Sequence, residues 1–357
     1  MGGLDAAELN SLLEHFHITK KKYELQAINN GYINDTYLVL DNMAPIYIFQ
    51  RINPSVFQDV IGLMGNVEKA LTYLVGDGYS PIELVKTRTG KAFFEQGEEG
   101  FWRLMTFIDQ SLTYNTTTNP EIAFEAGRII GKFHTLLQQA DVTEFVDTIP
   151  NFHNLQLRQE QFEQAQLHAE KDKLNTATAA VDFAKDTFPR LASLKNAKLP
   201  PRVCHNDTKL NNILFSKKET KSLCLIDLDT IMKGYFYFDF GDAVRTIVNT
   251  AQEDERELHK ITFEKELFRA FVNGLAVNSS FLTDQEKKSL HLGVVLMPFL
   301  HGLRALTDYL ENDKYYKVSY KGQNLDRCLS LFQFTKMALQ NLDYMQDVIQ
   351  EKLMLNS

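Results

Sequence analysis

The chain has 357 residues, of which 44% are apolar and 24% are charged, and this is enough material for two lobes that each have their own core. Its net charge of −8 argues against a nucleic-acid-binding protein. The three cysteines lie far apart and form no CxxC pair, so we expect neither a disulfide framework nor a zinc site. We also expect a cytoplasmic protein, because the N-terminal LDAAELNSLLEHFHI is no secretory signal and no apolar run approaches the roughly eighteen residues that span a membrane.

The first part of the chain is predicted to be rich in β-strands. Residues 5–17 carry apolar side chains at helical spacing, and residues 55–75 repeat that pattern over a longer helix. Short strand-like runs separated by Asn, Asp and Gly turns occupy residues 23–28, 32–40, 45–52, 82–88, 91–96 and 101–108. We therefore expect residues 1–108 to form a nucleotide-binding lobe, an antiparallel sheet with one helix inserted after the third strand.

The hydrophobic pattern of the sequence changes after Asp109, where long helical patterns become common. Asn119 and Pro120 are a helix start signal, and they open a helix that is predicted to end near residue 140. A charge-rich helix is predicted over residues 155–174, three short strands at 202–205, 212–215 and 222–228, and helices from 255 to the end. We expect residues 109–357 to form a larger, mainly helical lobe that holds the catalytic and substrate-binding residues, which gives an α+β, two-lobed protein.

The segment HNDTKLNN, residues 205–212, places many polar groups between two apolar runs. In phosphoryl transfer, a carboxylate such as Asp207 can accept the proton of the attacking hydroxyl, and the amide of Asn212 can ligate magnesium. Lys209 can lie beside the γ-phosphoryl group and neutralise charge as the bond breaks. Loops with these letters alone are common, so the interpretation also requires a metal-binding carboxylate further along the chain.

A second pair of carboxylates comes after the strand-like run SLCLI. Asp227 stands where a kinase places the aspartate that holds the metal ion. Asp229 projects to the same side if the strand continues, so it is a candidate second ligand or substrate contact. An aspartate after a strand is more often a turn or a helix cap, but together with Asn212 these oxygens are a ligand set that suits Mg²⁺. The conjunction predicts a phosphotransferase.

With these residues in view, the chain resembles the family of aminoglycoside phosphotransferases and choline kinases. The family motif His-x-Asp-x-x-x-x-Asn is matched by His205, Asp207 and Asn212, and its Ile-Asp pair by Asp227. A later aspartate of the family is matched by Asp239 in YFDFGD. The resemblance implies a protein-kinase-like fold, ATP and Mg²⁺ as cofactors, and structural roles for His205 and Asp239 in fixing the catalytic loop.

A narrower likeness is to the N-acetylhexosamine 1-kinases of that family. It is carried by GYINDTYLV, VFQDVIGLMGNVE, HNDTKLNNIL and IDLDTIM, and by RALTDYLENDKYY near the C-terminus. The likeness implies that Asp207 takes a proton from the anomeric hydroxyl and that Arg304 and Tyr315 bind the sugar, with Tyr32 near it. Sequence alone leaves open a surface pair between Arg304 and Asp308 four residues later, and it does not separate Tyr315 from Tyr316.

The predicted nucleotide-binding residues lie in the small lobe and in the joint between the lobes. A glycine-rich loop is missing, so Gly31 and Asn34 are the candidates for phosphate contacts. The third strand carries Gln50 where a kinase has its lysine, and Glu68 on the next helix consequently lacks its usual partner. The resemblance implies that backbone groups of the joint bind adenine, at Thr106, Phe107 and Ile108.

The predicted function is an ATP- and Mg²⁺-dependent kinase that phosphorylates the anomeric hydroxyl of N-acetylglucosamine or N-acetylgalactosamine. We expect no nucleic-acid partner and a monomer or a weak homodimer. One alternative is a kinase of the same fold that acts on choline, ethanolamine, homoserine or an aminoglycoside. Another is a nucleotide-binding module that has lost its chemistry, which the missing lysine favours and the intact Asp207, Lys209, Asn212 and Asp227 disfavour.

Overall fold

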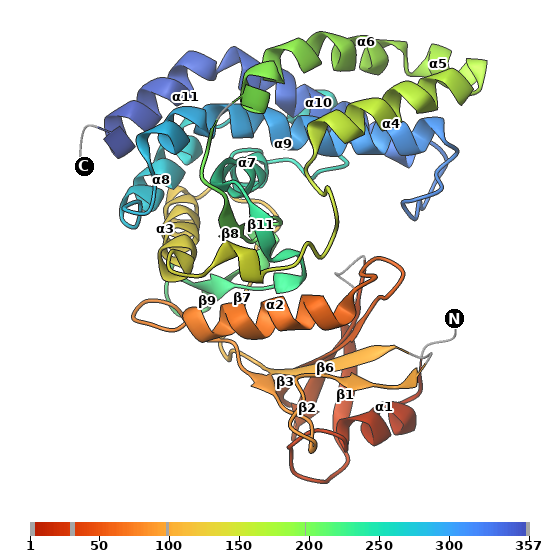
Figure 1. Ribbon diagram of the computed structural model, residues 1–357, viewed down its shortest axis with the longest axis vertical. Coiled ribbons are helices and arrows are strands. Elements are labelled where there is room, and N and C mark those ends of the chain that lie inside the picture. Colours follow the sequence, from red (N-terminus) through yellow and green to blue (C-terminus); the bar gives the residue numbers. More distant parts are fainter. Residues whose placement is uncertain (1–3, 29–32, 98–99, 197, 355–357) are drawn as a thin grey trace.

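Two lobes lie one above the other in the computed structural model, which describes residues 4–28, 33–97, 100–196 and 198–354 (Figure 1). The N-terminal lobe is built on an antiparallel sheet, and the C-terminal lobe is larger and mainly helical. The α+β, two-lobed class expected from the sequence is therefore confirmed.

The sheet of the small lobe has the strand order β1-β2-β3-β6-β4, and β5 also pairs with β6. Its strands are β1 (Glu24–Ile28), β2 (Asp35–Asp41), β3 (Ala44–Ile52), β4 (Leu84–Val85), β5 (Phe94–Glu95) and β6 (Phe101–Thr106). The register of β3 with β6 sets Phe49 opposite Leu104 and Gln50 opposite Arg103. Neighbouring residues of a strand point to opposite faces, so this register separates an apolar face from a polar one.

Each face of the sheet is covered by one helix. The outer face packs Phe49, Trp102 and Leu104 against α1 (Ala6–Leu13) in a buried cluster of its own. The inner face carries Gln50 and Arg103 and meets α2 (Val60–Tyr73), whose Met64 sulfur lies 3.8 Å from the Arg103 guanidinium. In Figure 1, α2 lies between the sheet and the large lobe, so the polar face is turned toward the other half of the protein.

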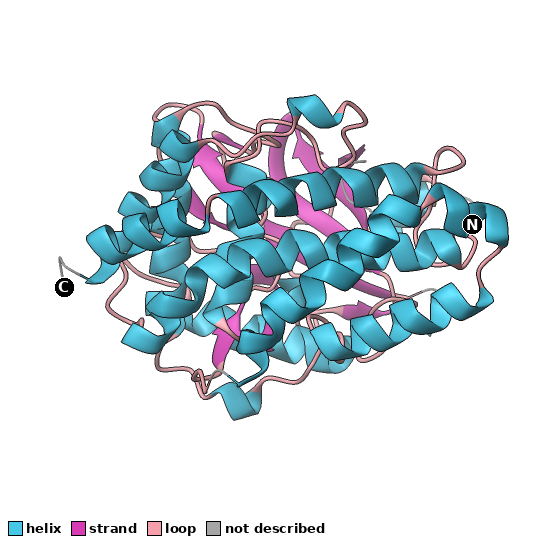
Figure 2. Ribbon diagram, turned by 90° about the horizontal axis from the view of Figure 1, so that it is seen from above, coloured by secondary structure: helices cyan, strands magenta, loops and turns pink. Residues whose placement is uncertain are grey.

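The large lobe is a stack of helices over short strands (Figure 2). Its helices are α3 (Pro120–Leu137), α4 (Leu155–His168), α5 (Lys171–Thr176), α6 (Thr178–Thr187), α7 (Phe236–Ile247), α8 (Lys265–Ala276), α9 (Asp284–Leu310), α10 (Gln323–Gln340) and α11 (Leu342–Ile349). Two small antiparallel sheets carry the loops of the site. One has the order β10-β9-β7 and the other pairs β11 with β8, with β7 (Ser111–Leu112), β8 (Arg202–Cys204), β9 (Ile213–Ser216), β10 (Ser222–Leu225) and β11 (Met232–Gly234).

Helix α9 is the core helix of this lobe. By length and composition it is the one described helix that could cross a membrane, but 72% of its apolar window is buried inside the protein. It packs closely on α7, because Gly241 and Gly293 let the two backbones meet: a Cβ at Gly241 would lie 2.1 Å from the Gly293 carbonyl oxygen. This contact fixes α7 beside α9.

Several predicted boundaries differ from the structure. The first helix ends at Leu13, and Phe16 instead forms an isolated bridge with Thr87. The strands predicted at 82–88 and 91–96 shorten to two residues each, and the predicted helix over 155–174 ends at His168. Tertiary context overrides local pattern at these places, since the short runs pair only where β6 offers a neighbour.

Candidate active site

Asp207 lies in the loop between β8 and β9. Its carboxylate oxygen Oδ2 accepts hydrogen bonds from Lys209 Nζ and from Asn212 Nδ2, both at 2.9 Å. The side chain of Asp207 remains 22% exposed. Because Asn212 uses its amide nitrogen on Asp207, its amide oxygen is left as an acceptor that can face a metal ion.

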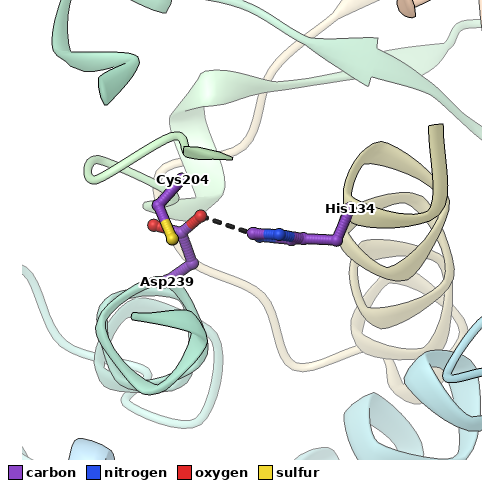
Figure 3. A group of neighbouring side chains, drawn as sticks. All are labelled: His134, Cys204 and Asp239. Carbon is purple, nitrogen blue, oxygen red and sulfur yellow. Dashed lines mark hydrogen bonds and ion pairs between the residues drawn. The ribbon is translucent and has the colours of Figure 1, made fainter. Parts of the chain in front are cut away.

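A buried carboxylate on α7 holds this loop in place. Asp239 accepts hydrogen bonds from the backbone N–H groups of His205 at 2.8 Å and Asn206 at 2.7 Å. His134 on α3 contacts the same carboxylate at 2.8 Å, and the Cys204 sulfur lies beside it (Figure 3). The backbone N–H groups of His205 and Asn206 are both directed at the Asp239 carboxylate. Burial, together with the charge of Asp239, raises the pKa of Cys204 well above its usual value, so the thiol is protonated. The hydrogen bonds of the group therefore give it a structural role, because they fix the backbone of the Asp207 loop to α7 and α3.

The catalytic loop is also tied to the segment that carries Asp227. The His205 ring contacts the Ile226 carbonyl oxygen at 2.8 Å, and the Ile226 N–H donates to Asn212 O at 2.9 Å. The side chain of Asn206 donates to Thr230 O at 3.0 Å. These bonds couple the two loops, so a shift of one displaces the other.

Asp227 lies directly after β10 and Ile226 in a left-handed backbone conformation, with φ 62° and ψ 60°. Burial among the surrounding protein atoms raises the pKa of its carboxyl to about 6, and Lys209 acts against this shift. Atoms of the protein crowd the carboxyl group, but the residue as a whole is exposed to solvent, and the charges of Asp229 and Asp207 act on the pKa in the same direction as burial. This concentration of negative charge and the amide oxygen of Asn212, whose backbone is hydrogen-bonded to Ile226, have the chemistry of an all-oxygen Mg²⁺ site. The residues present fit that ion.

Lys209 supplies positive charge at the same place. Burial would lower its pKa, but the Asp207 and Asp227 carboxylates raise it above its usual value, so the side chain stays charged. It is 30% exposed, so the side chain is accessible to an anionic ligand from solvent. This geometry suits the phosphate-neutralising role predicted for Lys209.

Asp229, predicted as a second metal ligand or a substrate contact, is engaged with the small lobe in this structure, and its role toward metal or substrate stays a prediction. Its side chain is only 3% exposed and turns toward the small lobe, where one oxygen lies 2.5 Å from Arg103 Nη1. The other oxygen accepts a hydrogen bond from Asn34 Nδ2 at 2.6 Å. The carboxylate is thus occupied by two small-lobe side chains, because the chain turns after Asp227 instead of continuing as a strand.

Asn34 and Gln50, predicted to bind nucleotide, have side chains that are engaged with other protein groups. Asn34 bridges Asp229 and the Asn53 N–H, and Gln50 donates to Thr36 while it accepts from Arg103. Their nucleotide contacts stay a prediction. The sequence prediction missed Arg103. A signal existed, because this arginine is the only charged residue in the apolar run FWRLMTFI.

The joint between the lobes starts where β6 ends. The N–H of Thr106 donates to Glu83 O and that of Phe107 to Ile46 O, each at 3.0 Å, while Ile108 O accepts from the Ser111 hydroxyl at 2.6 Å. The adenine contacts predicted for Thr106, Phe107 and Ile108 stay a prediction. Gly31 and Tyr32, predicted for phosphate and sugar, lie outside the described residues.

Arg304 on α9 is surrounded by aromatic rings. Its guanidinium carbon lies 5.3 Å from the ring centre of Phe152, 5.8 Å from that of Tyr315 and 5.9 Å from that of Tyr316. Among the described residues, no pair of Arg304 with Asp308 forms. Asp308 is buried and instead accepts from the Tyr315 and Tyr316 N–H groups at 2.7 and 2.9 Å.

Two histidines, one beside the Asp207 loop and one on α9, have ring centres 6.3 Å apart. His153 lies against the Asn206 carbonyl oxygen at 3.2 Å, and burial lowers its pKa to about 3, with His301 and Arg304 acting in the same direction, so its ring is neutral. His301 on α9 lies 3.4 Å from Asp242 on α7. The close contact of α7 with α9 is what places these groups beside the catalytic loop.

Comparisons with known proteins agree with this geometry. The model of the phosphotransferase enzyme family matches residues 24–307. Among solved structures, a microcompartment-associated aminopropanol kinase aligns with a TM-score of 0.63 and 17% identity, covering 96% of this chain and 99% of that chain. A spectinomycin phosphotransferase, solved with ADP and spectinomycin, aligns with a TM-score of 0.60 and 15% identity, covering 95% of this chain and 100% of that chain. A choline kinase from Cryptosporidium parvum aligns with a TM-score of 0.53 and 15% identity, covering 97% of this chain and 96% of that chain.

At these identities the solved structures establish the fold, which is the bilobal protein-kinase-like fold. The family match spans most of the chain and includes Asp207, Asn212 and Asp227. The chain belongs to the phosphotransferase enzyme family, the ATP-dependent small-molecule kinases that phosphorylate an alcohol group.

Proposed function

We propose that this protein is a cytoplasmic kinase that transfers the γ-phosphoryl group of ATP to the anomeric hydroxyl of an N-acetylhexosamine and releases the sugar 1-phosphate and ADP. The observation that carries the kinase chemistry is the convergence of Asp207, Lys209, Asn212 and Asp227 from two hydrogen-bonded loops. Asp207 accepts the proton of the acceptor hydroxyl while the hydroxyl oxygen bonds to the γ-phosphorus and the bond to the ADP oxygen breaks.

A divalent ion, when bound, neutralises the charge that develops on the phosphate oxygens. The residues that would hold it are Asn212 and Asp227. Lys209 adds a second positive charge on the side of Asp207, and this is valuable because β3 has Gln50 in place of a lysine. The chain's contribution is otherwise positioning, since a loose transition state needs little covalent help.

The charge around Arg304 supports a sugar acceptor over a cationic amine. Arg158 donates to the Phe152 carbonyl oxygen at 3.3 Å, and the Arg304 guanidinium lies over the Phe152 ring at 5.3 Å, so both cations are placed around one residue. Burial and the charge of Arg304 lower the pKa of Arg158. Neither has a carboxylate partner in the described part of the chain, whereas Arg245 and Arg327 are both paired with Glu253. A choline or aminoglycoside ammonium group placed there would be repelled. A neutral sugar can accept hydrogen bonds from Arg304 and stack on the Tyr315 ring, which is 62% exposed.

The test is an ADP-release assay with ATP and Mg²⁺ over N-acetylglucosamine, N-acetylgalactosamine, galactose, choline, ethanolamine, homoserine and an aminoglycoside. We expect turnover with an N-acetylhexosamine, and phosphorus NMR should place the new ester at the anomeric oxygen. Turnover only with an amino alcohol overturns the sugar assignment but is still consistent with a kinase that has another acceptor. ADP release with none of them, by a protein that binds ATP, favours the inactive module.

The same assay tests the role of Asp207. The Asp207→Asn variant should lower kcat by at least about a hundredfold, as expected when a general base is lost, with little change in ATP binding. Asp182→Asn on the exposed face of α6 is the matched control and should behave as the wild type. Undiminished kcat in a folded Asp207→Asn variant would contradict the proton-acceptor role.

A further inference from the structure

Arg103 is a fully buried arginine in the middle of β6, and 2% of its surface is exposed. Its Nε and Nη2 atoms donate to Gln50 Oε1 at 3.0 and 2.8 Å. Its Nη1 atom lies 2.5 Å from Asp229 Oδ1. The guanidinium group therefore connects the third strand of the small lobe with the loop that follows β10 in the large lobe.

The same carboxylate is held from a second side of the small lobe. Asn34 donates to Asp229 Oδ2 at 2.6 Å, and its own side-chain oxygen accepts from the Asn53 N–H at 3.0 Å. Asp229 is thus clamped by two side chains that come from separate segments of the small lobe. It lies in the short helical turn Leu228–Thr230, which starts directly after Asp227.

Asp227 needs such support because of its backbone. A non-glycine residue with φ 62° is in the left-handed region, which is costly and persists only where the surroundings fix it. The polypeptide is held on one side of Asp227 by the Ile226–Asn212 backbone bond and on the other side by the clamp on Asp229. The direction of the Asp227 carboxylate is set between these two points.

Protein kinases stabilise the small-lobe side of the site with a lysine on the third strand paired with a glutamate on the following helix. That pair does not form here. Gln50 stands on β3, and Glu68 on α2 pairs instead with Lys86 at the surface. Arg103 lies opposite Gln50 in the sheet register, so it brings a positive charge to the same face from the neighbouring strand.

Resting on the function proposed above, we propose that Arg103 is a positioning residue of this kinase, which holds Asp229 so that Asp227 is oriented to bind the metal ion. Its three nitrogen atoms are all engaged with protein groups. It acts through Asp229 and not by direct contact with phosphate. The role differs from simple stabilisation of the fold, because it predicts a loss confined to metal-dependent binding.

The experiment is calorimetric titration of the full chain with AMP-PNP, once in Mg²⁺ and once in EDTA. The variants are Arg103→Met, Asp229→Asn and the double variant, with Arg51→Met as matched control. Arg51 is the next residue after Gln50, on the opposite face of β3, where it pairs with Asp35. We expect Arg103→Met to weaken binding in Mg²⁺ about ten- to a hundredfold, as for other residues that orient metal ligands, and to leave binding in EDTA unchanged.

The double variant separates positioning from stability. A single substitution leaves an uncompensated buried charge, whereas the double variant removes both charges and should regain thermal stability. If Arg103 positions the metal ligand through Asp229, the double variant should regain thermal stability. It should still bind AMP-PNP in Mg²⁺ as weakly as either single variant, because the two losses of affinity are not additive. Wild-type affinity in the double variant, or in Arg103→Met, overturns the inference. If the wild type itself shows no Mg²⁺-dependent binding, the proposed function fails as well.

Discussion

At the scale of single residues, the least ordinary group of the site is Asp227. It combines a left-handed backbone, a position among other carboxylates and a raised pKa of about 6. A carboxyl group binds a divalent ion only when it is deprotonated. The electrostatics of the surrounding protein therefore bear on when the metal can bind.

The first prediction concerns pH. Because the raised pKa keeps the Asp227 carboxyl protonated below about 6 and charged above it, affinity for AMP-PNP in Mg²⁺ should fall as the pH drops from 7.5 to 5.5. The Asp227→Asn variant should bind weakly at every pH, with a flatter dependence. Calorimetric titrations across this range check it. An equally steep dependence in Asp227→Asn would assign the titration to another group.

At the scale of secondary-structure elements, the contact between α7 and α9 sets how the catalytic anchor lies relative to the proposed acceptor site. Helix α7 carries Asp239 and Asp242, while α9 carries His301 and Arg304. The catalytic anchor and the proposed acceptor site are thus joined by one helix pair. The backbones can approach because glycine stands on both sides of the contact.

The second prediction tests this contact. Gly241→Ala adds a methyl group 2.1 Å from the Gly293 carbonyl oxygen, so the helices must separate, and we expect a loss of about 1–3 kcal/mol in the free energy of unfolding. Gly65→Ala on α2 is the matched control, since its Cβ meets nothing within 4 Å. There the substitution should stabilise by about 0.5–1 kcal/mol, because alanine restricts the unfolded chain. Urea unfolding measures the free energy of unfolding of both variants. Equal changes in Gly241→Ala and Gly65→Ala would show that the close approach of α7 and α9 does not require glycine at position 241.

At the scale of the whole molecule, a partly buried ionic network joins α7 and α10 of the large lobe through the segment between α7 and α8. Arg245 on α7 lies 2.7 Å from Asp242 and 2.5 Å from Glu253, and Arg327 on α10 lies 2.6 Å from the same glutamate. Burial alone would raise the pKa of Glu253, but Arg327 and Arg245 hold it well below its usual value. A depressed carboxyl pKa contributes stability above the unfolded-state value and loses it as the pH falls.

The third prediction follows from the lowered pKa of Glu253. Glu253→Gln should be less stable than the wild type at pH 7, because the buried guanidinium group of Arg245 and the half-buried one of Arg327 lose a charged partner. The difference in the free energy of unfolding should shrink as the pH falls below 4.5, the usual pKa of this group, since the unfolded glutamate then gains a proton. Urea unfolding at several pH values from neutral down to about one pH unit below that pKa measures it. A constant difference would show that the network does not depress this pKa.

The sequence by itself determined the two-lobed class, and it predicts the residues of the candidate catalytic loop. The motif from His205 to Asn212 and the following Asp227 are close together along the chain, so their spacing carries the chemistry directly. Strand and helix types were also predictable where patterns were long, whereas runs such as 82–88 were overestimated, because a short strand needs a partner that local pattern does not reveal.

Only the tertiary structure decided which residues support that loop. Arg103 meets Asp229 across 126 positions of the chain, 229 minus 103, and this contact exists because the lobes stack with the inner face of the sheet toward the second loop. Likewise Arg304 gains its aromatic neighbours and not the nearby Asp308, because the Asp308 carboxylate accepts from the backbone of the segment after α9. Local spacing encodes the reacting groups, but the partners of a buried charge depend on how distant segments pack.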